Sequence, residues 1–173
     1  MLEGDIVELA TLEKLYVDEL KDLYSAEHQI IKALPKMIKA ASSKELRGGF
    51  ELHLKQTEQQ VKRLDKIFGR IGKAPTGKKC HGMEGLLEEG AELLKEDAEP
   101  AVLDAGMISA AQRVEHYEMA AYGTVRTYAE LLKQPGDAKL LQETLDEEKE
   151  TNEKLTKLAT KINIEAMEPQ ARR

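Results

Sequence analysis

The sequence predicts an all-α protein: a four-helix bundle with a long crossover that carries a short extra helix, in a single domain spanning residues 1–173. Apolar residues recur at steps of three, four or seven, which is the repeat of one helix face. Ala, Leu, Glu and Lys dominate, aromatic residues make up only 4%, and Trp is absent. Two short connections and one long connection between the apolar stretches predict two helical hairpins joined by the crossover.

The first helix is expected at about residues 8–41, with an apolar face that runs from Leu12 to Ile38. Pro35 lies inside this stretch, and a proline within a helix removes a hydrogen bond at a cost of about 3 kcal/mol. Because the apolar repeat continues past Pro35, we expect a kink at that position and not a break.

A capping box, formed by Ser42 and by Glu45 three residues later, predicts the start of the second helix, expected at about 44–71. Gly and Pro residues then mark a loop over 72–82. The next stretch, 83–96, reads MEGLLEEGAELLKE, which is typical of a short amphipathic helix.

Pro100 predicts the start of the third long helix, expected at about 101–133, because proline is favoured in a first helical turn. A tight turn over 134–137 follows, and Asp137 is the expected N-cap of the last helix, at about 138–163. The short helix in the middle connection would span roughly 21 Å, enough to travel much of the bundle's length. This order of hairpin, long crossover and hairpin is the topology of ferritin-like bundles.

Composition and charge exclude several classes of protein. The formal net charge of −6 at pH 7 argues against nucleic-acid binding, which needs a basic surface. No apolar run approaches the ~20 residues of a membrane span, and the acidic start does not resemble a secretory signal. The single cysteine, Cys80, cannot form an internal disulfide and fits a reducing compartment. We therefore expect a cytoplasmic protein that binds neither nucleic acid nor membrane.

Four glutamates on three helices interrupt the apolar faces: Glu27, Glu115, Glu118 and Glu148. A buried, unpaired carboxylate costs several kcal/mol, so acids that converge on one core are expected to be balanced by a cation. Glu118 and Glu148 lie at a similar depth, counted from the turn between their helices. The pattern predicts a carboxylate metal site, for which iron or manganese is the expected ion. Tyrosines near the inner faces, Tyr122 among them, are expected to pack in the core or to hydrogen-bond the carboxylates.

The second long helix contributes less certain ligands to this site. Gln60 and Glu58 lie at the depth of Glu27, and His53 lies about 10 Å along the axis from Gln60. Ferritin-like di-metal bundles use one Glu from each of two helices and a Glu-x-x-His pair from each of the other two. Neither Glu58 nor Glu148 is followed by His three residues later, so two nitrogen donors of that pattern are absent.

Five segments in a fixed order carry a resemblance to a known family: DLYSAEHQIIKALPKM, HLKQTEQQVKRLDKIF, CHGMEGLLEE, AAQRVEHYEMAAYGT and LLQETLDEEKETNEKLTKLA. They resemble the YciF/YciE-type stress-protein family of bacteria over about residues 8–162. The resemblance implies a ferritin-like helical bundle, a homodimer and a link to bacterial stress responses. The family's inward acids match Glu27, Glu115, Glu118 and Glu148, and its polar residues on the second helix match His53, Thr57 and Gln60.

Two functions remain open at this point. The first is a stress-response protein with an iron or manganese site that reacts with oxygen or peroxide. The alternative is a non-enzymatic, dimeric structural or interaction protein without a functional metal, in which some of the 32 acidic residues lie near an apolar stripe by chance. A storage cage is disfavoured, because no pattern indicates the several interfaces that a closed shell requires. The sequence assigns no catalytic residue and no small-molecule substrate.

Overall fold

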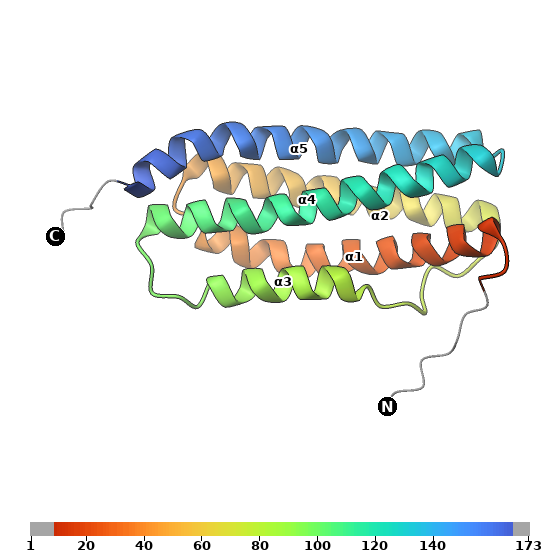
Figure 1. The fold of residues 1–173 in the computed structure, drawn as a ribbon, viewed down its shortest axis with the longest axis horizontal. Coiled ribbons are helices and arrows are strands. Elements are labelled where there is room, and N and C mark those ends of the chain that lie inside the picture. Colours follow the sequence, from red (N-terminus) through yellow and green to blue (C-terminus); the bar gives the residue numbers. More distant parts are fainter. Residues whose placement is uncertain (1–8, 168–173) are drawn as a thin grey trace, which may run out of the picture.

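The computed structural model describes residues 9–167, and these residues fold into five helices. These are α1 (Leu12–Ala40), α2 (Lys44–Ile71), α3 (His81–Leu93), α4 (Pro100–Leu131) and α5 (Pro135–Met167). Four of them are long and lie alongside one another, and the short α3 lies along one side (Figure 1). The described residues contain no strand, which confirms the predicted all-α class, and no helix among them is long and apolar enough to cross a membrane.

The helix limits agree with the predicted ones for α2 and differ at several other ends. The helix α1 begins at Leu12, where the Thr11 side chain caps it by accepting a hydrogen bond from the Lys14 amide. The expected start at residue 8 lies outside the described residues. The helix continues through Pro35 to Ala40. Compared with the prediction, α3 is displaced toward the N-terminus, and α5 is longer at both ends.

Two expected helix caps are wrong. Ser43, not Ser42, caps α2, and its hydroxyl accepts a hydrogen bond from the Leu46 amide. Asp137 does not cap α5, which begins at Pro135; its carboxylate lies 2.8 Å from the Arg70 guanidinium at the end of α2. Both side chains expected as caps instead contact residues distant in the sequence: Ser42 hydrogen-bonds Asp104, and Asp137 pairs with Arg70.

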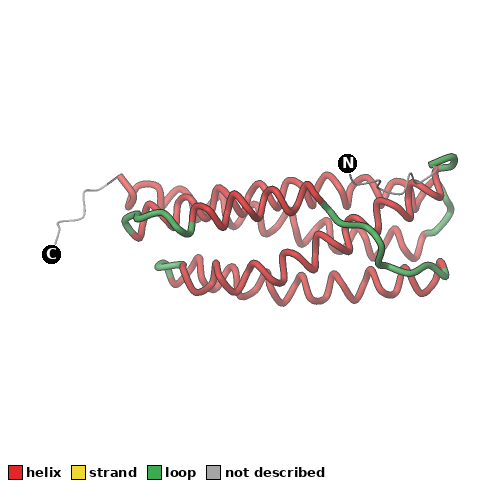
Figure 2. Tube along the Cα trace, turned by 90° about the horizontal axis from the view of Figure 1, so that it is seen from below, coloured by secondary structure: helices red, strands yellow, loops and turns green. Residues whose placement is uncertain are grey.

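The chain order gives two antiparallel hairpins, α1–α2 and α4–α5, which also contact each other through α1–α4 and α2–α5. In Figure 1, α2 and α4 run in the same direction, so the chain must return along the bundle between them. The loop over 72–80 turns back from the end of α2 (Figures 1 and 2). Gly72 allows this turn, because it ends α2 with a φ of 63°, in the left-handed region. The helix α3 then packs against α1 and α4.

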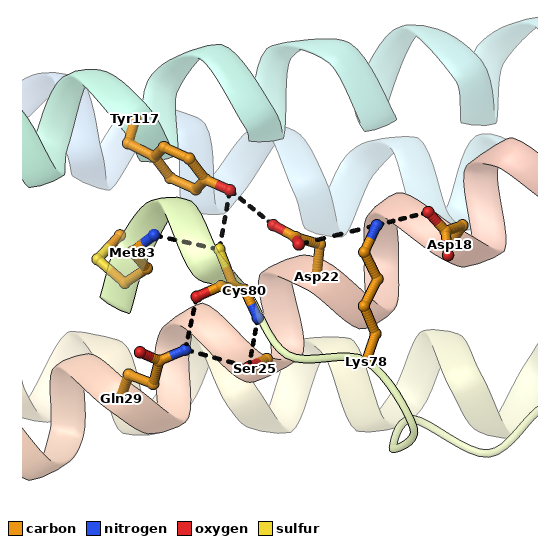
Figure 3. Close-up of polar contacts among 8 residues, drawn as sticks. All are labelled: Asp18, Asp22, Ser25, Gln29, Lys78, Cys80, Met83 and Tyr117. Atoms are coloured by element: carbon orange, nitrogen blue, oxygen red, sulfur yellow. Dashed lines mark hydrogen bonds and ion pairs between the residues drawn. The ribbon is translucent and has the colours of Figure 1, made fainter. Parts of the chain in front are cut away.

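A polar network fixes the crossover to α1 and α4 (Figure 3). The buried thiol of Cys80 lies 2.9 Å from the Tyr117 hydroxyl, which donates a 2.6 Å hydrogen bond to Asp22. Gly82 permits this approach, because a Cβ at that position would lie 2.8 Å from the Tyr117 ring. The network therefore holds α4 in place at the residue next to Glu118.

The core consists of two apolar clusters with a polar layer between them. One cluster contains Ile30, Phe50, Val114 and Leu155, and the other contains Leu23, Leu64, Tyr122 and Leu145. Seven of the ten buried polar residues that the structure describes fall between members of the two clusters along their helices: Glu27, His53, Thr57, Gln60, Glu115, Glu118 and Glu148. The other three, Asp104, Asp137 and Thr144, lie outside this layer. The helices thus place these polar side chains in a layer between the two apolar clusters.

Candidate metal centre

Four buried residues from three helices form a compact cluster: His53 on α2, Glu115 and Glu118 on α4, and Glu148 on α5. Each offers one nitrogen or oxygen atom, and these atoms all lie within 4.8 Å of one another. Ligands on opposite sides of a small divalent ion lie roughly 4.2 Å apart, twice a bond length of about 2.1 Å. The spacing of this four-residue cluster is therefore on the scale of one metal ion.

Many polar atoms of the cluster lack a hydrogen-bond partner among the described residues. They include both ring nitrogens of His53, both carboxylate oxygens of Glu118, and one oxygen each of Glu115 and Glu148. The Nε2 of His53 lies 3.5 Å from Oε1 of Glu115. Buried polar groups are almost always partnered in folded proteins, so this concentration of unpartnered atoms marks a place that could hold a metal ion. Three carboxylates and one imidazole suit a divalent cation.

Burial and mutual repulsion disfavour charge in the cluster. Burial raises the pKa of Glu118 well above the ordinary range, and the charges of Glu148, Glu27 and Glu115 raise it further. Burial likewise raises the pKa of Glu115, again reinforced by the charge of Glu148. The pKa of the His53 ring is lowered, chiefly by burial. A cation in the centre reverses this balance, because it favours ionised carboxylates and a neutral imidazole.

Glu27 lies beside the four-residue cluster and not within its group of four atoms. Its side chain is fully buried, and the Tyr122 hydroxyl donates a hydrogen bond to Oε1, while Oε2 has no partner among the described residues. Burial raises the pKa of Glu27 well above its ordinary value, and the charge of Glu148 adds to this effect. Glu27 is therefore the fourth buried glutamate of the same layer, and its Oε2 is available.

Gln60 positions Glu148. Its amide nitrogen donates hydrogen bonds to Glu148 and, at 3.0 Å, to Glu147. Glu147 is held in turn by Arg63, whose two terminal nitrogens each lie 2.7 Å from one of its carboxylate oxygens. Such supporting hydrogen bonds fix the orientation of a ligand carboxylate. Arg63 and Glu147 cannot be singled out from the sequence, because surface charge pairs are common and only the fold shows which pair contacts a core residue.

The two remaining candidates on α2 have different positions. Glu58 is exposed on the outer side of α2 and lies outside the cluster, so its carboxylate is solvated. His53, by contrast, is only 4% exposed and supplies the one nitrogen donor of the cluster. Its backbone carbonyl accepts a 2.9 Å hydrogen bond from the Thr57 hydroxyl, so the third polar residue matched on this helix supports the turn that carries His53.

Comparison with known proteins places this chain among bacterial proteins of the same size. Residues 11–168 match the family described as "Domain of unknown function (DUF892)". The chain is 44% identical over 152 residues to the protein YciF of Escherichia coli K12, covering 87% of this chain and 92% of YciF. The crystal structure of that E. coli stress protein superposes with a TM-score of 0.87 at 43% identity, over 90% of this chain and 99% of the other.

Two further solved structures are similar. YcfI of Rhodopseudomonas palustris, proposed to be a structural protein, has a TM-score of 0.83 at 43% identity, with 86% of this chain and 95% of YcfI covered. A protein of Xanthomonas campestris has a TM-score of 0.75 at 18% identity, with 91% of this chain and 97% of the other covered. At 18% identity, the similarity to the X. campestris protein shows that the two proteins share a fold and nothing more.

Proposed function

The chain belongs to the DUF892 family and is a homologue of the stress protein YciF, and we propose that its four-residue cluster binds a divalent iron or manganese ion. The observation that carries this proposal is the set of buried, unpartnered nitrogen and oxygen atoms that lie within 4.8 Å of one another. Mixed carboxylate and imidazole donors suit these two ions, and a positive charge offsets the repulsion among the acids.

The wider interpretation is a ferritin-like four-helix bundle that acts in the cytoplasm as a homodimer. Two features support a ferritin-like assignment: the return of the chain along the bundle between the hairpins, and a polar layer at mid-length. In this interpretation the bound ion supplies redox chemistry toward oxygen or peroxide. The chain's own residues hold the ion: His53 and the three glutamates provide donors, and the apolar cluster that contains Leu23 excludes water from one end of the layer.

Metal analysis of the protein purified without chelator tests this proposal. After loading with iron or manganese, we expect about one ion per chain and a higher melting temperature, because a ligand that binds only the folded state stabilises it by about 2.7 kcal/mol at a hundredfold excess over Kd. Glu118→Gln should abolish both effects. Glu58→Gln is the matched control, since it removes the same charge from an exposed position on the bundle. Fewer than about 0.2 ions per chain, with an unchanged melting temperature, would refute the proposal.

The second candidate function is a non-enzymatic structural or interaction protein of the stress response. The description of the R. palustris relative as a proposed structural protein favours it. In that case the polar layer contains no functional metal, and its acids are kept neutral by their raised pKa values. This candidate predicts that Glu118→Gln and Glu148→Gln leave the protein's partner binding and stress phenotype intact.

A further inference from the structure

A cavity of about 470 Å³ lies beside the four-residue cluster, and residues from all five helices line it. Most of the lining side chains are apolar, among them Ile30, Phe50, Leu87 and Leu155. The volume falls in the range of small-molecule sites, about 300–1,000 Å³. Exposed Leu52 and buried His53 both contribute to the lining, so the cavity connects the protein surface with the cluster.

We propose that this cavity binds a single-chain anionic amphiphile, an alkyl carboxylate, with its chain among the apolar side chains and its head group at the mouth beside Lys32 and Lys36. The apolar lining matches an aliphatic chain, because each buried methylene contributes about 0.8 kcal/mol to transfer from water. A partly open cavity also allows a charged head group to stay hydrated while the chain is buried.

The charges at the mouth favour an anionic head group. Lys32 and Lys36 lie one turn apart on α1, are both exposed, and form no ion pair with the described residues. Two of the acids that line the cavity are already paired with lysines: Glu45 with a lysine of α5 and Glu84 with one of the crossover loop. Among the residues that line the cavity, Glu88 is the one exposed acid without a lysine partner, so the exposed part of the lining has an excess of positive charge.

The inner end of the cavity determines the orientation of the chain. Glu115 and His53 line it there, and the other acids of the layer lie behind them. A carboxylate head group placed at this end would face buried acids, whereas a methyl terminus would contact apolar side chains such as Val114. The chain terminus therefore points toward the cluster. If the cluster holds a metal, the alkyl chain is the substrate class presented to it, and this last step rests on the proposed function.

Binding is tested on chelator-treated protein, so that the result does not depend on a metal. Isothermal titration calorimetry with octanoate, dodecanoate and hexadecanoate should give saturable, one-site binding that tightens with chain length up to the limit of the cavity. Dodecan-1-ol, with the same chain and no charge, should bind more weakly than dodecanoate. Absence of saturable binding by every carboxylate, or tighter binding of the alcohol, would overturn the proposal and leave the metal proposal untouched.

Two variants and their matched controls locate the ligand. Ala111→Phe fills the cavity from α4 and should abolish dodecanoate binding, whereas Ala120→Phe, at an exposed position of the same helix, should not. The double variant Lys32→Gln/Lys36→Gln should bind dodecanoate roughly tenfold more weakly and dodecan-1-ol unchanged, with Lys39→Gln as the control. Unaltered dodecanoate affinity in Ala111→Phe or in the double variant would contradict the assigned position.

A measurement on the unmodified protein covers the case in which Ala111→Phe does not fold. An alkyl carboxylate with a nitroxide at its chain terminus should broaden the methyl NMR signals of Val114 and Leu155. The same molecule labelled next to the carboxylate should broaden signals near Lys36 instead. The reverse pattern would exclude the proposed orientation, and uniform weak broadening over the surface would exclude the site.

Discussion

Asp104 and Glu118 are two buried carboxylates on α4, about 21 Å apart along the helix axis, and their surroundings are opposite. Asp104 accepts three hydrogen bonds from the turn between α1 and α2: from the Ser42 amide at 2.9 Å, the Ser42 hydroxyl at 2.6 Å and the Ser43 amide at 2.7 Å. Neither oxygen of Glu118 has a partner among the described residues. One carboxylate fastens the fold, and the other is available to bind.

The same contrast, between partnered and unpartnered polar groups, separates the crossover network that contains Tyr117 from the four-residue cluster that contains Glu118. In the crossover network, the Cys80 thiol, the Tyr117 hydroxyl and Asp22 are partnered to one another (Figure 3). In the four-residue cluster, the side chains approach one another without satisfying their hydrogen-bonding capacity. A satisfied network rigidifies a fold, whereas an unsatisfied one costs stability unless a ligand completes it. If the cluster binds a metal as proposed, this difference separates the buried polar residues that stabilise the fold from those that bind the ion.

The largest expected effect on stability comes from Asp104, the carboxylate that binds the turn between α1 and α2. Asp104→Asn replaces one acceptor oxygen by an NH₂ group, which cannot accept the hydrogen bonds from Ser42 and Ser43. Because hydrogen bonds to a charged group contribute about 1.5–3 kcal/mol each, we expect a loss of about 2–3 kcal/mol in the free energy of unfolding. Urea unfolding measures it. A loss below about 0.5 kcal/mol would mean that Asp104 is not a structural anchor.

The same chemical change at Glu118 should have the opposite sign. In chelator, Glu118→Gln removes a carboxylate that lies among Glu27, Glu115 and Glu148, and it should raise the free energy of unfolding by about 1–2 kcal/mol. In the presence of the metal, the variant should be the less stable protein, since it loses the stabilisation that the ion provides. Urea unfolding with and without metal gives both numbers. A variant that is destabilised in chelator would show that Glu118 serves the fold.

The pH dependence of the metal-free protein sharpens this comparison. Glu27, Glu115 and Glu118 have pKa values raised by burial, so the folded state binds more protons than the unfolded state above the ordinary carboxyl pKa. Stability contributed by these groups is therefore present at low pH and is lost as the pH rises through their raised pKa values. The lowered pKa of His53 acts in the opposite direction below its ordinary pKa, but it is one group against three.

In chelator, the free energy of unfolding should therefore increase from neutral pH toward about pH 5. Glu118→Gln should flatten this slope by up to about 1.4 kcal/mol per pH unit, the contribution of one proton. Urea titrations at several pH values give both slopes. Parallel curves for the two proteins would mean that Glu118 is ionised in the folded state across this range.

The elements of the fold could be predicted closely because each long helix carries its own apolar repeat. The caps could not, because the competing partners of Ser42 and Asp137 are residues more than sixty positions away. For the candidate site, the acids are visible in the sequence as exceptions on apolar faces, but the sequence does not show that His53 approaches them. The helical repeat gives the distance of His53 from Gln60 along α2. The axial offset between the two hairpins is set by packing, and this offset brings His53 level with Glu115.

The smallest expected effect comes from the crossover network, in which the polar groups are hydrogen-bonded to one another. Tyr117→Phe removes the hydroxyl that joins the Cys80 thiol to Asp22, and we expect a loss of about 1 kcal/mol in the free energy of unfolding. The control is Tyr128→Phe, because the Tyr128 hydroxyl makes no hydrogen bond to the described residues. Metal content per chain should be unchanged in both variants, since the network positions α4 without supplying a ligand. Loss of metal from Tyr117→Phe alone would show that the two regions are coupled, and that the crossover network sets the geometry of the cluster as well as the stability of the fold.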